Sequence, residues 1–185
     1  TSKSPLLYPL RLIAGAYTDI FRGLPLLLVL LHVGFGIPGL QISWIPNSAV
    51  ILGTFSLILT YTAYVAEVIR AGIEAVSPTQ RMAARSLGLT HWQAQRYVVL
   101  PQAFRKVTPP LLNDLVSLQK DSGLISVLGA IDAIRSAGIE TAQSFNFTPY
   151  IVAGLFFVAL TIPLTRFTDW LTRKQDQARQ QGGQW

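Results

Sequence analysis

Cysteine is absent from this 185-residue sequence, and histidine occurs only twice, at His32 and His91. The lack of cysteine excludes a disulfide framework, a thiolate zinc site and a cysteine nucleophile. Two histidines so far apart form no ligand motif, so no metal site is predicted. No G-x-x-x-x-G-K run occurs either, so the chain has no P-loop with which to bind ATP. Because no Ser/His/Asp set or carboxylate pair is visible, we do not expect an enzyme.

Charged residues are also scarce. They make up 13% of the sequence, against about 25% in soluble domains, and the mean hydropathy is +0.40. No Asp, Glu, Lys or Arg occurs in the 44 residues between Arg22 and Glu67. A helix crosses a bilayer with about 20 apolar residues, so this stretch accommodates two crossings separated by turn residues within 36–47. The composition therefore predicts an integral membrane protein.

Four membrane-spanning helices are predicted. In chain order they cover residues 23–35 extended by about a turn, 47–66, 109–128 and 150–164. The span at 109–128 is irregular, because Asp114, Lys120 and Asp121 interrupt it. Together the spans form a transmembrane domain at residues 23–174, with a long connecting loop at 70–108.

Both ends of the chain lie outside the spans. Residues 1–22 carry apolar side chains at helical spacing between basic residues, which favours an interfacial lead-in helix over a plain polar segment. The Gln-rich tail at 175–185 is predicted to be disordered. Aromatic residues near the span ends, which we predict to lie in the interfacial belts, are Trp44, Tyr150 and Trp170.

The basic residues are distributed unevenly. Of the 15, 13 lie before the first span, in the 70–108 loop or after the last span. Only Arg135 lies in the connectors on the other side, and Lys120 lies within a span. Cytoplasmic loops carry an excess of Lys and Arg, so both ends and the 70–108 loop are predicted to be cytoplasmic. An even number of spans is consistent with this layout.

Two short helices are predicted within the 70–108 loop. Ser77-Pro78-Thr79-Gln80 has the pattern of a capping box and should begin a helix that ends near Leu87. Gly88 is placed to end that helix in a left-handed conformation. A second capping box, Thr90-His91-Trp92-Gln93, should begin another short helix that ends before Pro101. The loop is therefore predicted to be a compact helix-turn-helix rather than a linker.

The pattern Ala83-Ala84-x3-Gly88-x9-Val98-x-Leu100-Pro101 within this loop resembles the EAA loop of binding-protein-dependent ABC importer permeases. Met82 stands where that family usually has Glu, and the family usually carries one more span before the lead-in. Further runs resemble the polar amino-acid permeases of this family, and the resemblance covers residues 8 to 174. These runs are residues 21–27 (FRGLPLL), 64–73 (YVAEVIRAGI), 100–103 (LPQA), 109–111 (PPL) and 118–122 (LQKDS).

The resemblance implies an all-α, polytopic transmembrane helical bundle with the type I ABC importer permease fold. It implies a multi-pass protein of the bacterial inner membrane that moves a polar amino acid and binds no cofactor itself. A partner ATPase subunit would bind ATP and Mg and dock on the loop. The other implied partners are a second permease subunit, identical or a paralogue, an extracytoplasmic solute-binding protein and membrane lipid. The residues predicted to contact the ATPase are Arg81, Ala83, Ala84, Arg85, Leu87 and Gly88, and membrane-surface anchoring is the alternative for the two arginines.

Ionisable residues inside a span are functional-site hypotheses by default. Asp121 could hold the α-ammonium group of an amino acid and Lys120 its α-carboxylate, with Ser122 interrupting the helix to open a cavity. Neighbouring spans could instead satisfy these groups. Asn113 is a further pathway candidate, and Glu67 is either a gate residue or the partner of Arg70 at i+3.

Two other functions fit the sequence less well. A structural or assembly membrane protein without a substrate is the main alternative, and the intramembrane Lys120 and Asp121 argue against it. The helix-turn-helix pattern also imitates a DNA-binding module. Its position between spans and the early Pro101 argue against that interpretation, so no nucleic-acid partner is expected.

Overall fold

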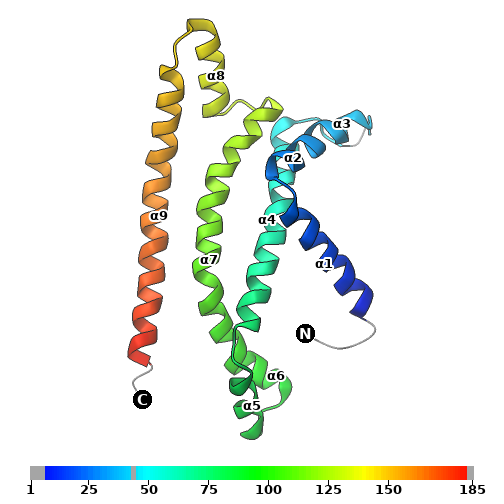
Figure 1. Cartoon of the computed structure of the whole chain (residues 1–185), viewed down its shortest axis with the longest axis vertical. Helices are drawn as coiled ribbons and strands as arrows, with labels where there is room; N and C mark the ends of the chain where they lie inside the picture. Colours follow the sequence, from blue (N-terminus) through cyan, green and yellow to red (C-terminus); the bar gives the residue numbers. More distant parts are fainter. Residues whose placement is uncertain (1–6, 43–44, 183–185) are drawn as a thin grey trace. The chain divides into compact units, whose positions relative to one another are not determined.

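The structure is a computed structural model that describes residues 7–42 and 45–182 (Figure 1). Trp44, a predicted belt residue, lies outside these ranges. Within them the regular secondary structure consists of helices and turns without a strand. The all-α prediction is therefore confirmed.

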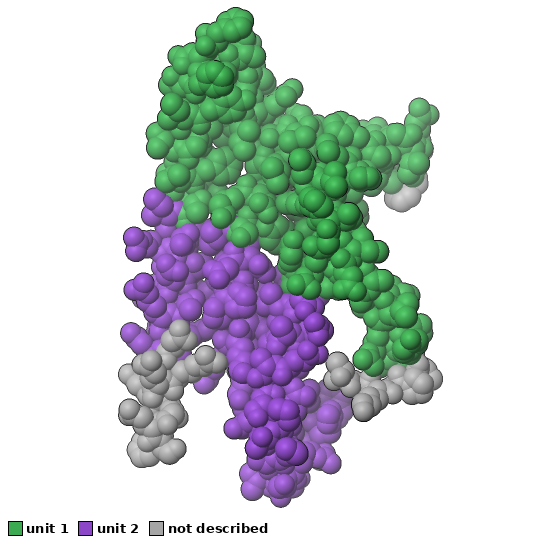
Figure 2. All heavy atoms as spheres, viewed as in Figure 1, with its two compact units in different colours: residues 1–64, 117–161 green, residues 65–116, 162–185 purple. Residues whose placement is uncertain are grey.

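The chain divides into two compact units (Figure 2). Unit 1 comprises Thr1–Tyr64 and Ser117–Thr161, and unit 2 comprises Val65–Val116 and Ile162–Trp185. Three helices contribute to both units: α4 (Ala49–Glu74), α7 (Leu100–Asp121) and α9 (Thr148–Gly182).

Unit 1 begins with a bent pair of helices. Helix α1 (Tyr8–Gly23) is the predicted lead-in, and the hydroxyl of Tyr17 donates a hydrogen bond of 2.6 Å to the Leu59 carbonyl oxygen of α4. Helix α2 (Leu26–Leu31) follows at an angle of 105°, and continues through the π-helical η2 (His32–Gly36) into α3 (Ile37–Gly39).

Helix α2 begins at Leu26, whereas the sequence predicts that the first span begins at Gly23. Leu24 has extended backbone angles, with φ −87° and ψ 133°. The residue before a proline avoids the helical region, because the proline ring clashes with it. Pro25 therefore forces the break between α1 and α2.

The 3₁₀-helix η4 (Ser122–Leu128) packs closely against other parts of unit 1 through glycines. A Cβ added at Gly34 would lie 2.3 Å from Leu128, and one added at Gly53 of α4 would lie 2.5 Å from Ile125. One added at Gly123 would lie 2.9 Å from Phe157 of α9. Small residues allow close helix approach inside membranes, so these glycines bring η2, α4 and α9 onto η4. Helix α8 (Ala133–Ser144) follows, and Figure 1 shows it beside the start of α9.

Unit 2 contains the predicted helix-turn-helix. Helix α5 (Pro78–Ser86) is followed by α6 (His91–Ala94) and the π-helical η3 (Gln95–Val99), which leads into α7 (Figure 1). A small core of Val76, Val99 and Ala103, with Ile73 against it, joins the helices.

The prediction that the second short helix ends before Pro101 was wrong, because α6 continues through η3 into α7. In η3 the Leu100 amide donates to the Gln95 carbonyl, five residues earlier. A proline in a regular helix clashes with the carbonyl four residues before it, and a π-helical turn relieves such constraints locally. The wide turn lets the chain pass Pro101 without breaking.

Among the described residues, two helical segments are long and apolar enough to cross a membrane, Ala49–Glu74 and Thr148–Gln175. The number rises to four if each bent pair counts as one span: Tyr8–Gly23 with Leu26–Gly39, and His91–Leu128 with Ala133–Ser144. Helix α9 continues to Gly182, within the tail that the sequence predicts to be disordered, and residues 183–185 of that tail lie outside the described ranges.

Candidate functional site

The helix-turn-helix in unit 2 is defined by its caps. Thr90 and Gln93 form a complete capping box, with hydrogen bonds of 3.3 and 2.8 Å in the two directions. At α5 the predicted box is incomplete, because the Ser77 side chain accepts from the Thr79 amide. Gly88 ends α5 with φ at +85°, and the Leu89 amide donates a hydrogen bond of 3.2 Å to the Ala84 carbonyl oxygen. The left-handed C-cap is therefore confirmed.

Two basic side chains attach this loop to the end of α4. Arg81 Nη2 donates a hydrogen bond of 2.7 Å to the Ile73 carbonyl oxygen, and Lys106 Nζ donates to the Ala75 carbonyl oxygen. Carbonyls at a helix C-terminus lack intrahelical partners and favour cations. A Cβ added at Gly72 would lie 2.0 Å from Val107, so α4 and α7 approach closely here. The loop is built rigidly onto both helices.

The predicted docking residues differ in accessibility. Ala83, Arg85, Leu87 and Gly88 are exposed, with Leu87 at 84%, whereas Ala84 is only 4% exposed. Ala84 therefore packs inside unit 2, and Arg81 bonds to its own chain. On the two short helices α5 and α6, the exposed apolar side chains that the prediction did not include are Met82 and Trp92. Leu87, Met82 and Trp92 are the groups through which this loop can bury apolar surface against a partner.

Unit 1 contains the predicted carboxylate. Asp121 ends α7 and precedes η4, and its Oδ2 accepts a hydrogen bond of 2.8 Å from the Tyr61 hydroxyl of α4. Lys120 and Ser122 on either side are exposed, while Asp121 is partly buried. Consecutive residues of a helix do not face each other. The structure thus brings Asp121 together with Tyr61 rather than with Lys120.

A second polar contact in unit 1 lies two residues earlier on α7. Thr161 Oγ1 of α9 donates a hydrogen bond of 2.8 Å to Gln119 Oε1, and the Ser122 hydroxyl donates 2.7 Å to the Gln119 carbonyl. Helices α4 and α9 therefore each supply one side chain that bonds to a polar residue near the end of α7. This is where the helix changes to 3₁₀ geometry.

The other two pathway candidates lie in unit 2. Glu67 accepts hydrogen bonds of 2.9 and 2.5 Å from Arg70. Arg70 also donates a hydrogen bond of 2.9 Å to Glu74. This geometry is the i+3 ion pair that the sequence allowed as one of two interpretations. Asn113 is exposed on α7.

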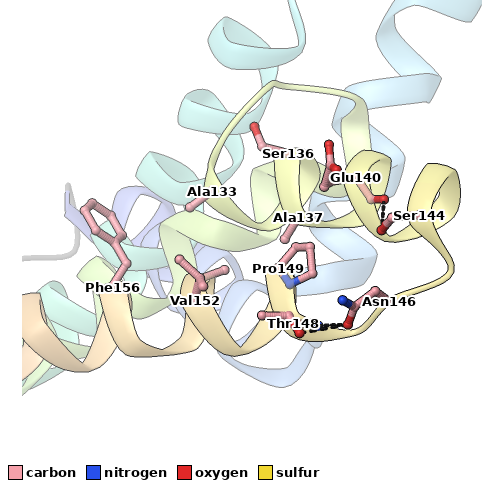
Figure 3. A pocket seen from close by; sticks show the side chains of 11 residues that line it. Ala133, Ser136, Ala137, Glu140, Ser144, Asn146, Thr148, Pro149, Val152 and Phe156 are labelled. Carbon is pink, nitrogen blue, oxygen red and sulfur yellow. Dashed lines mark hydrogen bonds between the residues drawn. The ribbon is translucent and has the colours of Figure 1, made fainter.

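A cavity of about 700 Å³ lies between α8 and the start of α9 in unit 1 (Figure 3). Glu140 is the only ionisable residue in its lining, which also includes Ser136, Asn146 and Phe156. Asn146 Oδ1 accepts from the amide and the hydroxyl of Thr148, at 2.9 and 2.7 Å. No group of His, Asp or Glu side chains able to hold a metal ion occurs within the part of the chain that the structure describes.

Residues 8–177 match the family described as binding-protein-dependent transport system inner membrane components. The chain belongs to this family. It is 40% identical over 157 residues to the arginine transport system permease protein ArtQ of Bacillus subtilis (strain 168), covering 83% of this chain and 69% of the relative. It is 36% identical over 173 residues to the probable glutamine ABC transporter permease protein GlnM of the same organism, covering 92% and 78%.

A crystal structure of an amino acid ABC transporter with histidines matches the fold of this permease. The TM-score is 0.84 at 38% identity, and the match covers 91% of this chain and 78% of that one. The fold is therefore that of an amino-acid ABC importer permease. The chain is a membrane transport subunit related to polar amino-acid permeases.

The sequence interpretation did not identify Tyr61 as a site residue of this permease. A signal was present, because Tyr61 lies in the part of α4 that precedes Glu67 and carries no charged residue. A partly buried hydroxyl within a membrane span needs a polar partner. The interpretation also did not include Glu140, which lies in the connector at 129–149.

Proposed function

We propose that this permease imports a polar amino acid across the bacterial inner membrane, driven by a separate ATPase subunit that docks on the 70–108 loop. The observation that best supports this proposal is how that loop is attached to α4. It is clamped to α4 by Arg81 and Lys106, yet it exposes Leu87. A rigid element with an exposed apolar side chain can transmit a partner's movement to the helices to which it is fixed.

The orientation follows from the basic residues. The excess of Lys and Arg in the loop and at both ends of this chain supports a cytoplasmic position for these segments, where ATP is available. The partner ATPase would bind ATP and Mg, because the permease has no P-loop. A second permease subunit and an extracytoplasmic solute-binding protein would complete the importer.

The proposed substrate contact is Asp121. An amino acid carries an α-ammonium group, and a partly buried carboxylate is its natural partner. Lys120 is not included, because its side chain leaves α7 in another direction. The relatives are an arginine permease, a probable glutamine permease and, in Escherichia coli, a glutamate/aspartate import permease, so we propose a polar amino acid as the substrate class.

Co-purification tests the docking assignment. The permease would be extracted from its native membranes in mild detergent, and the associated proteins identified by mass spectrometry. We expect an ATPase subunit with the unmodified chain and its loss with Leu87→Asp, which alters a side chain that is 84% exposed. Ile131→Asp is the matched control, because Ile131 is 81% exposed but lies outside the 70–108 loop. Retention of the ATPase by Leu87→Asp would contradict the proposal.

A further inference from the structure

The side chain of Asp121 accepts one hydrogen bond from the residues that the structure describes. Within residues 7–42 and 45–182 its side chain forms no ion pair, and Tyr61 binds Oδ2. An ionised carboxylate has about four acceptor sites on two oxygens. The Tyr61 hydroxyl occupies one of them, so Oδ1 remains able to accept from a ligand. A half-satisfied carboxylate at this depth is costly unless a second donor arrives.

Tyr61 is well placed to fix the direction of this carboxylate. It is the thirteenth of the 26 residues of α4, the midpoint of a candidate membrane span. Its ring contacts Tyr64 edge-on, with centroids 5.8 Å apart. Asp121 lies on another helix, at the change from α7 to η4. A hydroxyl held from α4 therefore restricts the rotation of a side chain carried by α7.

We propose that Tyr61 is a positioning residue for the substrate, an inference that rests on the proposed function. Its hydroxyl holds Oδ2 of Asp121 so that Oδ1 faces the incoming α-ammonium group. The ammonium supplies the second donor, and its positive charge compensates the carboxylate. This role differs from that of a hydrogen bond that only stabilises the packing of two helices. Loss of such a bond lowers the amount of folded protein, whereas loss of a positioning residue lowers the affinity for the ligand.

The test uses uptake by the source organism with each variant as the sole copy of the permease. Radiolabelled glutamine, arginine and glutamate are the probes, each over a range of concentrations. We expect Tyr61→Phe to raise KM about tenfold for the transported amino acid, the size expected for one hydrogen bond to a charged group. The maximal rate and the thermal stability of the purified complex should change little. Tyr64→Phe is the matched control, and its KM should stay within about twofold of the unmodified value.

The outcomes separate the two proposals. A lower maximal rate or lower stability at an unchanged KM in Tyr61→Phe would overturn the positioning role and leave the import function standing. A parallel Asp121→Asn variant should raise KM at least as much as Tyr61→Phe. Normal uptake kinetics in Asp121→Asn would remove the carboxylate from the pathway and the positioning role with it. Unchanged uptake of all three amino acids after deletion of the permease would overturn the proposed function itself, and this inference with it.

Discussion

Arg81 and Ile73 are joined by a hydrogen bond of 2.7 Å, from the guanidinium of the loop helix α5 to the carbonyl at the end of α4. With the Lys106 contact to Ala75, it supplies side-chain donors to carbonyls at the end of α4, where Ile73 also accepts from the Val76 amide. The EAA-like loop is therefore fastened to α4 by side chains as well as by the chain connection.

The two arginines of α5 should have separable roles. Arg81→Ala removes the bond to Ile73 and should destabilise the loop by about 1 kcal/mol. Arg85→Ala alters an exposed side chain on the same helix and should leave loop stability unchanged. Hydrogen exchange of the amides at residues 76–99 in the purified complex measures this difference. Equal loss of protection in both variants would contradict the clamp.

Gly88 should tolerate some side chains and reject others for conformational reasons alone. No atom lies within 4 Å of an added Cβ, but φ is +85°. Gly88→Val should destabilise the complex by about 1–2 kcal/mol, because a β-branched residue is strained there. Gly88→Asn should cost less, since Asn also ends helices in this conformation. Thermal unfolding of the purified complex compares the two, and similar melting temperatures would contradict this account.

Gly72 should be needed for its small size. The Cβ of Gly72→Ala would lie 2.0 Å from a methyl carbon of Val107, and overpacking of this kind costs about 1–3 kcal/mol. Gly154→Ala on α9 is the control, because no atom lies within 4 Å of its added Cβ. Thermal unfolding should show destabilisation only at Gly72, and adding Val107→Ala should relieve it. If the double variant were no more stable than Gly72→Ala, the close contact would not be the cause.

Glu67 should behave as an ion-pair partner rather than as a gate. Its contact with Arg70 is on the surface, with 55% of the arginine side chain exposed. Arg70 retains its ion pair with Glu74 when Glu67 is changed. Surface ion pairs contribute little to stability. Uptake assays on Glu67→Gln should therefore give a KM within about twofold of the unmodified value. A large rise in KM would restore Glu67 to the substrate pathway.

Much of the local structure follows from the sequence because its causes are local. Thr90 and Gln93 cap α6 from within four residues, and Gly88 supplies a conformation that other residues avoid. The charge-free stretch after Arg22 indicates membrane spans for a similar reason, since transfer into the bilayer depends on composition. The family resemblance also rests on such short runs. These features need no knowledge of which helices meet.

The contacts of the site depend instead on residues far apart in the chain. The helix-turn-helix was expected, but not that Arg81 binds its own chain or that Ala84 faces inward, because both depend on how α5 packs. Asp121 was a candidate from its charge alone, while its partner Tyr61 lies 60 residues away on another helix. The sequence by itself determined the helices, the spans and the ionisable candidates, through local geometry and hydropathy. Only the tertiary structure decided which polar groups pair, because that depends on where close packing brings the helices together.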